Sequence, residues 1–279
     1  MNINWSAITT IKNRHSVRTF STQPVATEQQ TQLEEFVKTL DNPFHQPVHF
    51  HYLNRTDTLG AQKLGTYGII KGSQHFMGAT IEQDGLNLEA LGFEFECAIL
   101  YLTHLGLGSC WMGGTFDRQG FAGAMAIKQG ELFPIISPYG YPADKPHLTE
   151  KAMRLLVRAD SRKDPTSLFF YEDFNTPLTK EKAGPWSVPL EMVRLAPSAS
   201  NKQPWRVLLR GGFLHFYEAQ SPGYSSAFSF DIQRIDLGIA AAHFFLAAQE
   251  LNLPGRFDQR RPPLDLPENY FYRFSWVPD

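Results

Sequence analysis

Two arginine residues near the start of the chain, Arg14 and Arg18, lie four residues apart in the segment RHSVRTF. On or just after a helix, two guanidinium groups at this spacing can converge on one anion, because each presents several N–H donors in a rigid plane. Ser16 lies between them and adds a hydroxyl group. The segment is therefore a candidate anion site, and a solvated basic turn is the alternative.

A second candidate segment is LAPSASNKQPW, residues 195–205. Its small residues let a flat ligand approach the backbone, and Pro197 and Pro204 stiffen its two ends. Hydroxyl and amide side chains in such a loop suit the edge of a polar heterocycle or the hydroxyl groups of a polyol. An ordinary helix-to-strand loop is the alternative. The polar side chains are those of Ser198, Ser200, Asn201 and Gln203.

A third segment, GSCWMGGTF, contains Gly113 and Gly114, which can expose backbone N–H groups where a side chain would block them. A simple turn is again the alternative. Cys97 and Cys110 form no CxxC motif and have no histidine at metal-ligand spacing, which favours buried reduced thiols over a metal centre. The absence of GxSxG, HExxH and P-loop motifs argues against hydrolases and nucleotide-hydrolysing enzymes.

Hydrophobic periodicity predicts the elements that position these residues. Two long and mostly apolar stretches, residues 85–111 and 235–255, predict helices buried in a large core. Residues 27–40 predict an amphipathic helix with Thr27 as its N-cap. The other predicted elements are helices over residues 4–13 and 188–197, strands over residues 47–54 and 132–142, and a hairpin over residues 205–218 around Gly211-Gly212.

The order of these elements repeats on either side of a charged, partly helical junction at residues 144–164. Three short matches occur in the same order at nearly the same offset, which favours two copies of one fold in a single chain. A repeat of this length is too long for a solenoid. The matches pair Leu91-Gly92 with Leu237-Gly238 at an offset of 146, Gln46-Pro47 with Gln203-Pro204 at 157, and Arg14 with Arg162 at 148.

The chain has 279 residues and a formal net charge of −2. This length allows one large domain or two smaller ones, and the near-neutral charge argues against nucleic-acid binding. Aromatic residues make up 13% of the chain, which suits a core-rich fold or a planar ligand. No apolar run has the length of a signal peptide or a membrane span, so we expect a cytoplasmic protein.

Read together, four segments resemble the FMN-dependent nitroreductase family: RHSVRTF, LAPSASNKQPW, HLGLGSCWMGG and GYPADKP. The resemblance is greatest to the branch in which two nitroreductase-like halves are fused in one chain. It implies an α+β fold with mixed sheets, long buried helices, and halves at residues 1–155 and 156–279 that form an intrachain pseudo-dimer. Because the family's dimer interface is then internal, a monomer is expected.

The same resemblance assigns FMN ligands to this sequence. Arg14, His15, Ser16 and Arg18 would hold the phosphate, ribityl chain and pyrimidine edge, and Lys145 would contact the phosphate. Gly113 and Gly114 would give backbone contacts near N5 and O4 of the flavin. From the other half, the residues that would pack against the ring and ribityl chain are Pro197, Ser198, Ala199, Ser200, Asn201 and Gln203.

Each half keeps only part of this set. The first half has LDNPFHQPV where the Ser/Asn loop belongs, and the second half has SRKDPTSLF where the arginine motif belongs. Since the losses are complementary, we expect one composite FMN site per chain.

The resemblance implies that FMN transfers two electrons from NAD(P)H to a nitroaromatic, a quinone or a similar small-molecule acceptor by a ping-pong mechanism. No acid–base side chain is assigned, and Arg18 or Lys202 would stabilise the reduced flavin. A flavin-binding, storage or sensor protein with little turnover, or a remnant that binds no flavin, are the alternatives. The sequence does not place residues 64–78, does not distinguish NADH from NADPH, and does not identify the acceptor.

Overall fold

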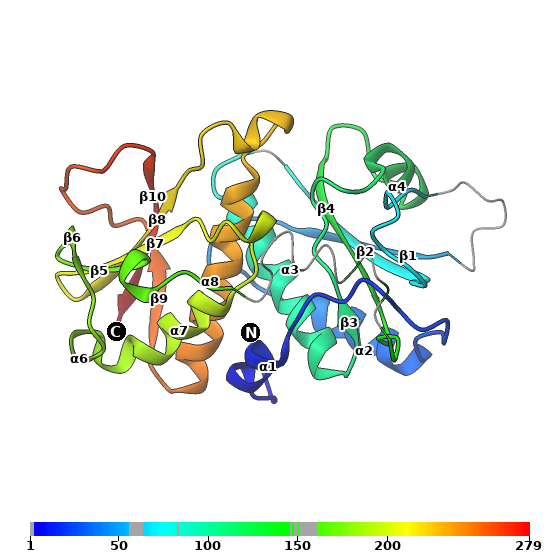
Figure 1. The fold of residues 1–279 in the computed structure, drawn as a ribbon, viewed down its shortest axis with the longest axis horizontal. Coiled ribbons are helices and arrows are strands. Elements are labelled where there is room, and N and C mark those ends of the chain that lie inside the picture. The colour runs from blue at the N-terminus through cyan, green and yellow to red at the C-terminus, as the bar shows by residue number, and fades with distance from the viewer. Residues whose placement is uncertain (1–2, 56–63, 83, 146, 148–149, 151–160) are drawn as a thin grey trace.

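Two β-sheets flank a central pair of long helices, α3 (Asn87–His104) and α8 (Ile232–Glu250), in the computed structural model of the chain (Figure 1). The structure describes residues 3–55, 64–82, 84–145, 147, 150 and 161–279. Over these residues no helix has the length and apolar character needed to cross a membrane. The predicted α+β architecture with long buried helices is confirmed.

The first sheet has the strand order β1-β2-β4-β3, and the second has the order β6-β5-β7-β8-β10-β9. Neighbouring strands are antiparallel except β5 and β7, which are parallel. The strands are β1 (His49–Asn54), β2 (His75–Ile81), β3 (Gly108–Ser109), β4 (Leu132–Gly140), β5 (Phe169–Tyr171), β6 (Asp173–Pro177), β7 (Trp205–Arg210), β8 (Phe213–Ala219), β9 (Gly255–Asp258) and β10 (Tyr270–Pro278). The shorter helices are α1 (Ala7–Asn13), α2 (Thr27–Lys38), α4 (Arg118–Ala124), α6 (Lys180–Ala183) and α7 (Ser187–Leu195).

The chain follows the same path twice. Strands β1 and β2 lead into α3 and then β3 and β4, which we call the first repeat; β7 and β8 lead into α8 and then β9 and β10, the second repeat. The resulting orders, β1-β2-β4-β3 and β7-β8-β10-β9, are the same. The strand register also corresponds. Gly78 pairs with Ile136 in the first sheet, and the residues 138 positions later, Phe216 and Phe274, pair with each other in the second sheet. Topology and register thus agree with the fold of two similar halves.

The two long helices cross where a glycine of each one meets the backbone of the other. A Cβ on Gly92 would lie 2.1 Å from the carbonyl oxygen of Ile235, and a Cβ on Gly238 would lie 2.0 Å from that of Glu89. Both pairs are related by the offset of 146 residues, so the contact is reciprocal, as at a two-fold symmetric interface. The residues that the sequence comparison aligned therefore lie on a pseudo-two-fold axis.

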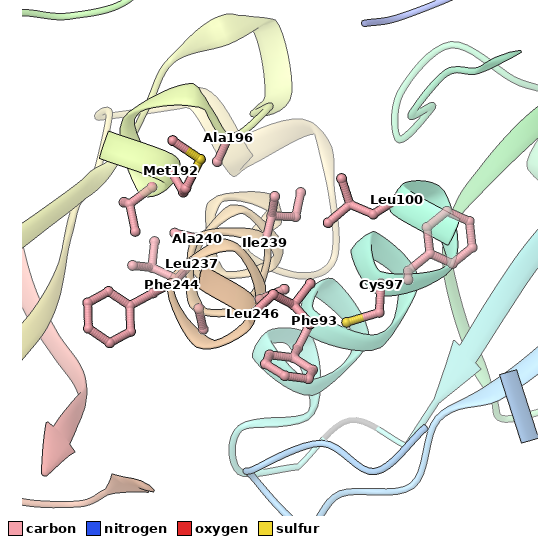
Figure 2. Packing of buried hydrophobic residues seen from close by; sticks show 14 of the residues in the cluster. Phe93, Cys97, Leu100, Met192, Ala196, Leu237, Ile239, Ala240, Phe244 and Leu246 are labelled. Atoms are coloured by element: carbon pink, nitrogen blue, oxygen red, sulfur yellow. The ribbon is translucent and has the colours of Figure 1, made fainter. Parts of the chain in front are cut away.

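Buried side chains surround both helices, which explains why neither has a polar face. On α3 only Tyr101, Thr103 and His104 are not fully buried. Figure 2 shows side chains of α3 packed against α8, while α7 covers another face of α8 through Met192. The labelled side chains of the two long helices are Phe93, Cys97 and Leu100 on α3, and Leu237, Ile239, Ala240, Phe244 and Leu246 on α8.

The predicted helix over residues 85–111 is too long, because α3 ends at His104. Gly106 adopts a φ of +76°, and the N–H of Leu107 donates to the carbonyl oxygen of Leu102 at 2.9 Å. This left-handed ending stops the helix and frees residues 108–109 to form β3. Helix α8 ends with the same hydrogen bond 146 residues further on, where Asn252 replaces Gly106.

Two other sequence expectations differ from the structure or lie beyond it. Thr27 is the first residue of α2 rather than its N-cap, and Ala26 at the cap position offers no side-chain acceptor. The domain boundary predicted between residues 155 and 156, and most of the predicted junction at 144–164, lie outside the described residues. The exact division into halves therefore stays a prediction.

Candidate functional site

A cavity of about 400 Å³ brings together segments from distant parts of the chain. Residues 14–18, 110–115 and 197–201 contribute to its wall, together with the first turns of α8. Its size lies within the roughly 300–1,000 Å³ typical of small-molecule sites. The predicted residues that line it are Arg14, Ser16, Arg18, Gly113, Gly114, Pro197, Ser198, Ala199, Ser200 and Asn201.

The arginine segment reaches the cavity as an extended strand rather than as a helix. Helix α1 ends before Arg14, whose ψ of 127° is extended. Ser16 then forms a parallel bridge with Ser109, and the N–H of Val17 donates to the carbonyl oxygen of Ser109 at 2.8 Å. Successive side chains of an extended segment point to opposite faces, so residues 14, 16 and 18 share one face.

His15 is not in the cavity lining for the same reason. It lies on the opposite face of the extended segment, is exposed, and its Nδ1 contacts the carbonyl oxygen of Asn13 at 3.1 Å. Lys145 is exposed and also lies outside the lining. The structure therefore does not bring these two predicted ligands to the cavity.

The glycine turn lets the backbone of the first repeat approach the second. A Cβ on Gly113 would lie 2.7 Å from Cδ1 of Ile232, and one on Gly114 would lie 3.2 Å from Cζ of Phe228. Arg118 stabilises the turn, since its Nη2 donates to the carbonyl oxygen of Gly113 at 2.7 Å. A side chain at position 113 would therefore displace the end of Ile232 on α8.

The loop at 197–203 has a strained backbone that side-chain contacts hold in place. Ser200, Asn201 and Gln203 have φ values of 47°, 54° and 50°. Positive φ is unfavourable for these residue types, and such strain often occurs at ligand sites. The N–H of Gln203 donates to Oγ of Ser198 at 2.8 Å, and the hydroxyl of Tyr224 donates to Oγ of Ser200 at 2.8 Å. The loop is therefore shaped before any ligand arrives.

Gln203 supports this loop instead of lining the cavity. It is 3% exposed, and its Oε1 accepts the N–H of Lys163 at 2.8 Å. Its Nε2 lies 3.2 Å from both oxygens of Asn201, the carbonyl and the amide. Because both ends of the amide bond to protein groups, the predicted contact of Gln203 with a ligand is corrected to a role in loop structure.

The charges around the cavity are mainly positive. Arg14, Arg18 and Arg162 line it, and Nη1 of Arg18 is buried with no hydrogen-bond partner among the described residues. Arg162 donates to the carbonyl oxygen of Leu195 at 3.1 Å. Burial raises the pKa of the Cys110 thiol, which keeps that lining residue uncharged. Three guanidinium groups make the cavity suitable for an anion.

Comparison with protein families decides the identity of the fold. A family model described as "Putative TM nitroreductase" matches residues 6–248. The chain belongs to this nitroreductase family. No curated protein matches this nitroreductase-family chain in sequence.

One solved structure shows the same fold, and two others are further matches. A "putative nitroreductase" from Thermotoga maritima has a TM-score of 0.62 and 22% identity, and the match covers 99% of this chain and 95% of that one. A nitroreductase family protein from Clostridium novyi NT has a TM-score of 0.41 and 16% identity over 50% of this chain and 87% of that one. An "FMN-dependent Nitroreductase" from Clostridium difficile R20291 has a TM-score of 0.40 and 14% identity over 49% of this chain and 87% of that one.

The sequence of this nitroreductase-family chain did not reveal every lining residue. Arg162 had been aligned with Arg14 as part of a degenerate copy, yet both residues line one cavity. Asp236 also lines it, as the acid within the apolar stretch IDLGIAAA, and that isolated charge was a signal in the sequence. The apolar and aromatic lining residues Trp111, Tyr224, Phe228 and Ile232 carried no signal that separates them from core residues.

Proposed function

We propose that this chain binds one FMN in the cavity and transfers two electrons from NAD(P)H to an electron-poor acceptor such as a nitroaromatic or a quinone. The observation that carries the proposal is the composite lining, in which the arginine segment, the glycine turn and the Ser/Asn loop enclose one cavity. Membership of the nitroreductase family supports the same activity.

The residues present fit a flat, anionic cofactor. The buried Nη1 of Arg18 is an unsatisfied donor at the cavity, and a buried unsatisfied donor costs about 1–3 kcal/mol unless a ligand accepts from it. Gly113 and Gly114 pack beside Ile232 and Phe228 in the cavity wall, and these two side chains give the wall an apolar surface that suits a ring. These features match a phosphate and an aromatic ring system better than they match a sugar or a peptide.

Within this proposal the chain's own residues bind and orient. Arg14, Arg18 and Arg162 hold anionic groups, and the hydroxyls of Ser16 and Ser200 face a polyol chain. Bound FMN supplies the electron-transfer chemistry. Arg18 is the better candidate for stabilising negative charge on the reduced ring, because Lys202 lies outside the lining with its Nζ 5.3 Å from the ring centroid of Tyr224.

The absorbance spectrum and the flavin-to-protein ratio of the purified chain test this function. We expect a yellow protein with a ratio near one, and NAD(P)H oxidation that accelerates when a quinone or a nitroaromatic is added. A ratio near two would contradict the single site. Bound flavin without turnover would support the alternative of a storage or sensor protein, and a colourless chain that takes up no FMN would overturn the proposal.

A further inference from the structure

Asp236 is a buried carboxyl group that the proposed electron transfer does not use. It lies in the second turn of α8, is 3% exposed and lines the cavity. Its Oδ1 accepts the N–H of Ala199 at 3.0 Å. Its Oδ2 is buried and has no hydrogen-bond partner among the described residues. One oxygen therefore positions the Ser/Asn loop while the other is left for an occupant of the cavity.

Packing does not require a carboxyl group at this position. The residue 146 positions earlier, at the equivalent place on α3, is Ala90, which is fully buried. On α8 the neighbouring lining residues Ile232, Ile235 and Ile239 are apolar. A polar group buried without a full set of partners destabilises the folded chain. A ligand that bonds to Oδ2 would offset this cost.

The charges around Asp236 favour its neutral form. Burial raises its pKa well above the ordinary value and outweighs the N–H of Ala199, which lowers it. The negative charges of Glu218 on β8 and Asp231 at the N-cap of α8 act in the same direction as burial. Tyr224 also lies close enough for the two groups to interact. A neutral carboxyl group carries an O–H donor.

We infer that Asp236 is a further cofactor-binding residue, which donates a hydrogen bond from a protonated Oδ2 to an acceptor atom on the flavin ring. This inference rests on the proposed function. A flavin ring offers several carbonyl and ring-nitrogen acceptors but few N–H donors, so a donor has more places to bind. A neutral donor also accommodates the negative charge of a reduced ring, which an ionised carboxylate would repel.

The affinity for FMN, measured by fluorescence titration from neutral to alkaline pH, tests the inference. In the wild-type chain we expect the Kd to rise as Asp236 ionises. Asp236→Asn retains an N–H donor and cannot ionise, so its Kd should stay close to the neutral wild-type value at every pH. Asp236→Ala, which copies Ala90, should bind about tenfold more weakly than the neutral wild type at every pH.

A control addresses Glu218, a second buried acid whose charge acts on Asp236. Burial raises the pKa of Glu218 to about 7, and Glu218 does not line the cavity. Glu218→Gln should therefore keep a pH-dependent Kd, with its midpoint moved to lower pH because one negative charge near Asp236 is removed. A D236N chain with the wild-type pH dependence, or a D236A chain with wild-type affinity, would overturn this inference alone. A wild-type chain that binds no FMN would overturn the proposed function, and the inference with it.

Discussion

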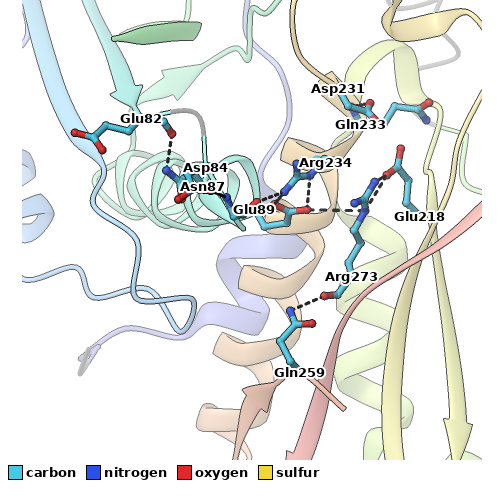
Figure 3. A network of polar contacts seen from close by, with 11 residues as sticks. Glu82, Asp84, Asn87, Glu89, Glu218, Asp231, Gln233, Arg234, Gln259 and Arg273 are labelled. Carbon is cyan, nitrogen blue, oxygen red and sulfur yellow. Dashed lines mark hydrogen bonds and ion pairs between the residues drawn. The ribbon is translucent and has the colours of Figure 1, made fainter. Parts of the chain in front are cut away.

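The first turns of α3 and α8 are equivalent in the internal repeat, yet different groups pack on them. On α3, Glu89 is fully buried and accepts two hydrogen bonds from Arg234, at 2.8 and 2.7 Å. Arg273 lies 3.9 Å from the same carboxylate and also bonds to Glu218, as Figure 3 shows. An ion-pair network occupies this end of the helix pair.

At the first turns of α8, apolar residues occupy the region that is equivalent to the ion-pair network at the first turns of α3. Ile235 occupies the position of Glu89 at an offset of 146, and Ile135 lies on β4, the counterpart of the strand β10 that carries Arg273. Both isoleucines line the cavity. The same backbone framework thus holds a cavity at one end and a network of long charged side chains at the other. This difference supports one flavin site per chain.

Substitutions at the symmetric crossing of α3 and α8 are expected to cause the largest loss of stability. Gly92→Ala would place a Cβ 2.1 Å from the carbonyl oxygen of Ile235, so the helices must separate, and we expect a loss of more than about 3 kcal/mol in the free energy of unfolding. Gly238→Ala should cost a similar amount. Urea denaturation measures both. Gly123→Ala on α4, where a Cβ would meet nothing within 4 Å, is the control and should be neutral or slightly stabilising.

The ion-pair network should matter for stability and not for flavin binding. Glu89→Ala leaves Arg234 and Arg273 without their shared partner, and we expect a loss of about 3 kcal/mol in unfolding free energy with unchanged flavin stoichiometry. Thermal and urea unfolding, together with the flavin ratio, measure this. Glu191→Ala, which breaks the surface pair with Arg194, should cost less than about 0.5 kcal/mol. Loss of flavin from the E89A chain would mean that the two ends are coupled.

In each repeat an acid of the long helix bonds to the loop before the first strand: Glu94 on α3 bonds to Asn42, and Asp236 on α8 bonds to Ala199. The pH dependence of the unfolding free energy tests the role of Glu94. Burial raises the pKa of Glu94 to about 7, and its Oε1 accepts from Nδ2 of Asn42 at 2.6 Å. Since the folded pKa lies above the unfolded one, Glu94 contributes stability that is present below about pH 4.5 and lost as the pH rises through 7. We expect about 2 kcal/mol of this dependence, and Glu94→Gln should remove it. An unaltered stability profile in E94Q would show that other groups cause it.

The smallest expected effect is that of Arg18→Ala, which should change FMN affinity and leave stability almost unchanged. Arg18→Ala removes a donor with a buried and unpartnered Nη1, so FMN affinity should fall about tenfold, as for one charged hydrogen bond, with little change in unfolding free energy. Fluorescence titration measures the Kd. Arg256→Ala on β9, an exposed arginine outside the cavity, should leave the Kd unchanged. Equal effects of the two substitutions would indicate that only the overall charge matters.

Much of the fold could be predicted because it depends on local patterns. The hairpin of β7 and β8 turns at Gly211 and Gly212, which both have positive φ, as predicted. The apolar runs predicted both long helices. The end of α3 was predicted too late because several glycines follow it, and the sequence does not show that Gly106 is the one that adopts the left-handed turn. Motif resemblance placed ten lining residues in advance, because each lies in a short contiguous segment.

The errors at the site have a common physical origin. The sequence placed residues 14–18 on or just after a helix without fixing their conformation, and pairing of Ser16 with Ser109 made them extended, which turned His15 away from the cavity. It treated Gln203 as a ligand, and contact with Lys163 made it a loop support. In each case a partner far along the chain decided where the side chain points, and local periodicity contains no information on that partner.

The sequence by itself determined the two long helices, the hairpin of β7 and β8, the repeated order of the elements it predicted and the family, since these follow from periodicity and contiguous motifs. Tertiary structure decided which residues share the cavity. The close crossing at Gly92 and Gly238 sets the position of α8 against the first repeat, and so brings Asp236 and the Ser/Asn loop to the arginine segment. Buried contacts between helices fix such distances to fractions of an ångström, and only the folded chain contains them.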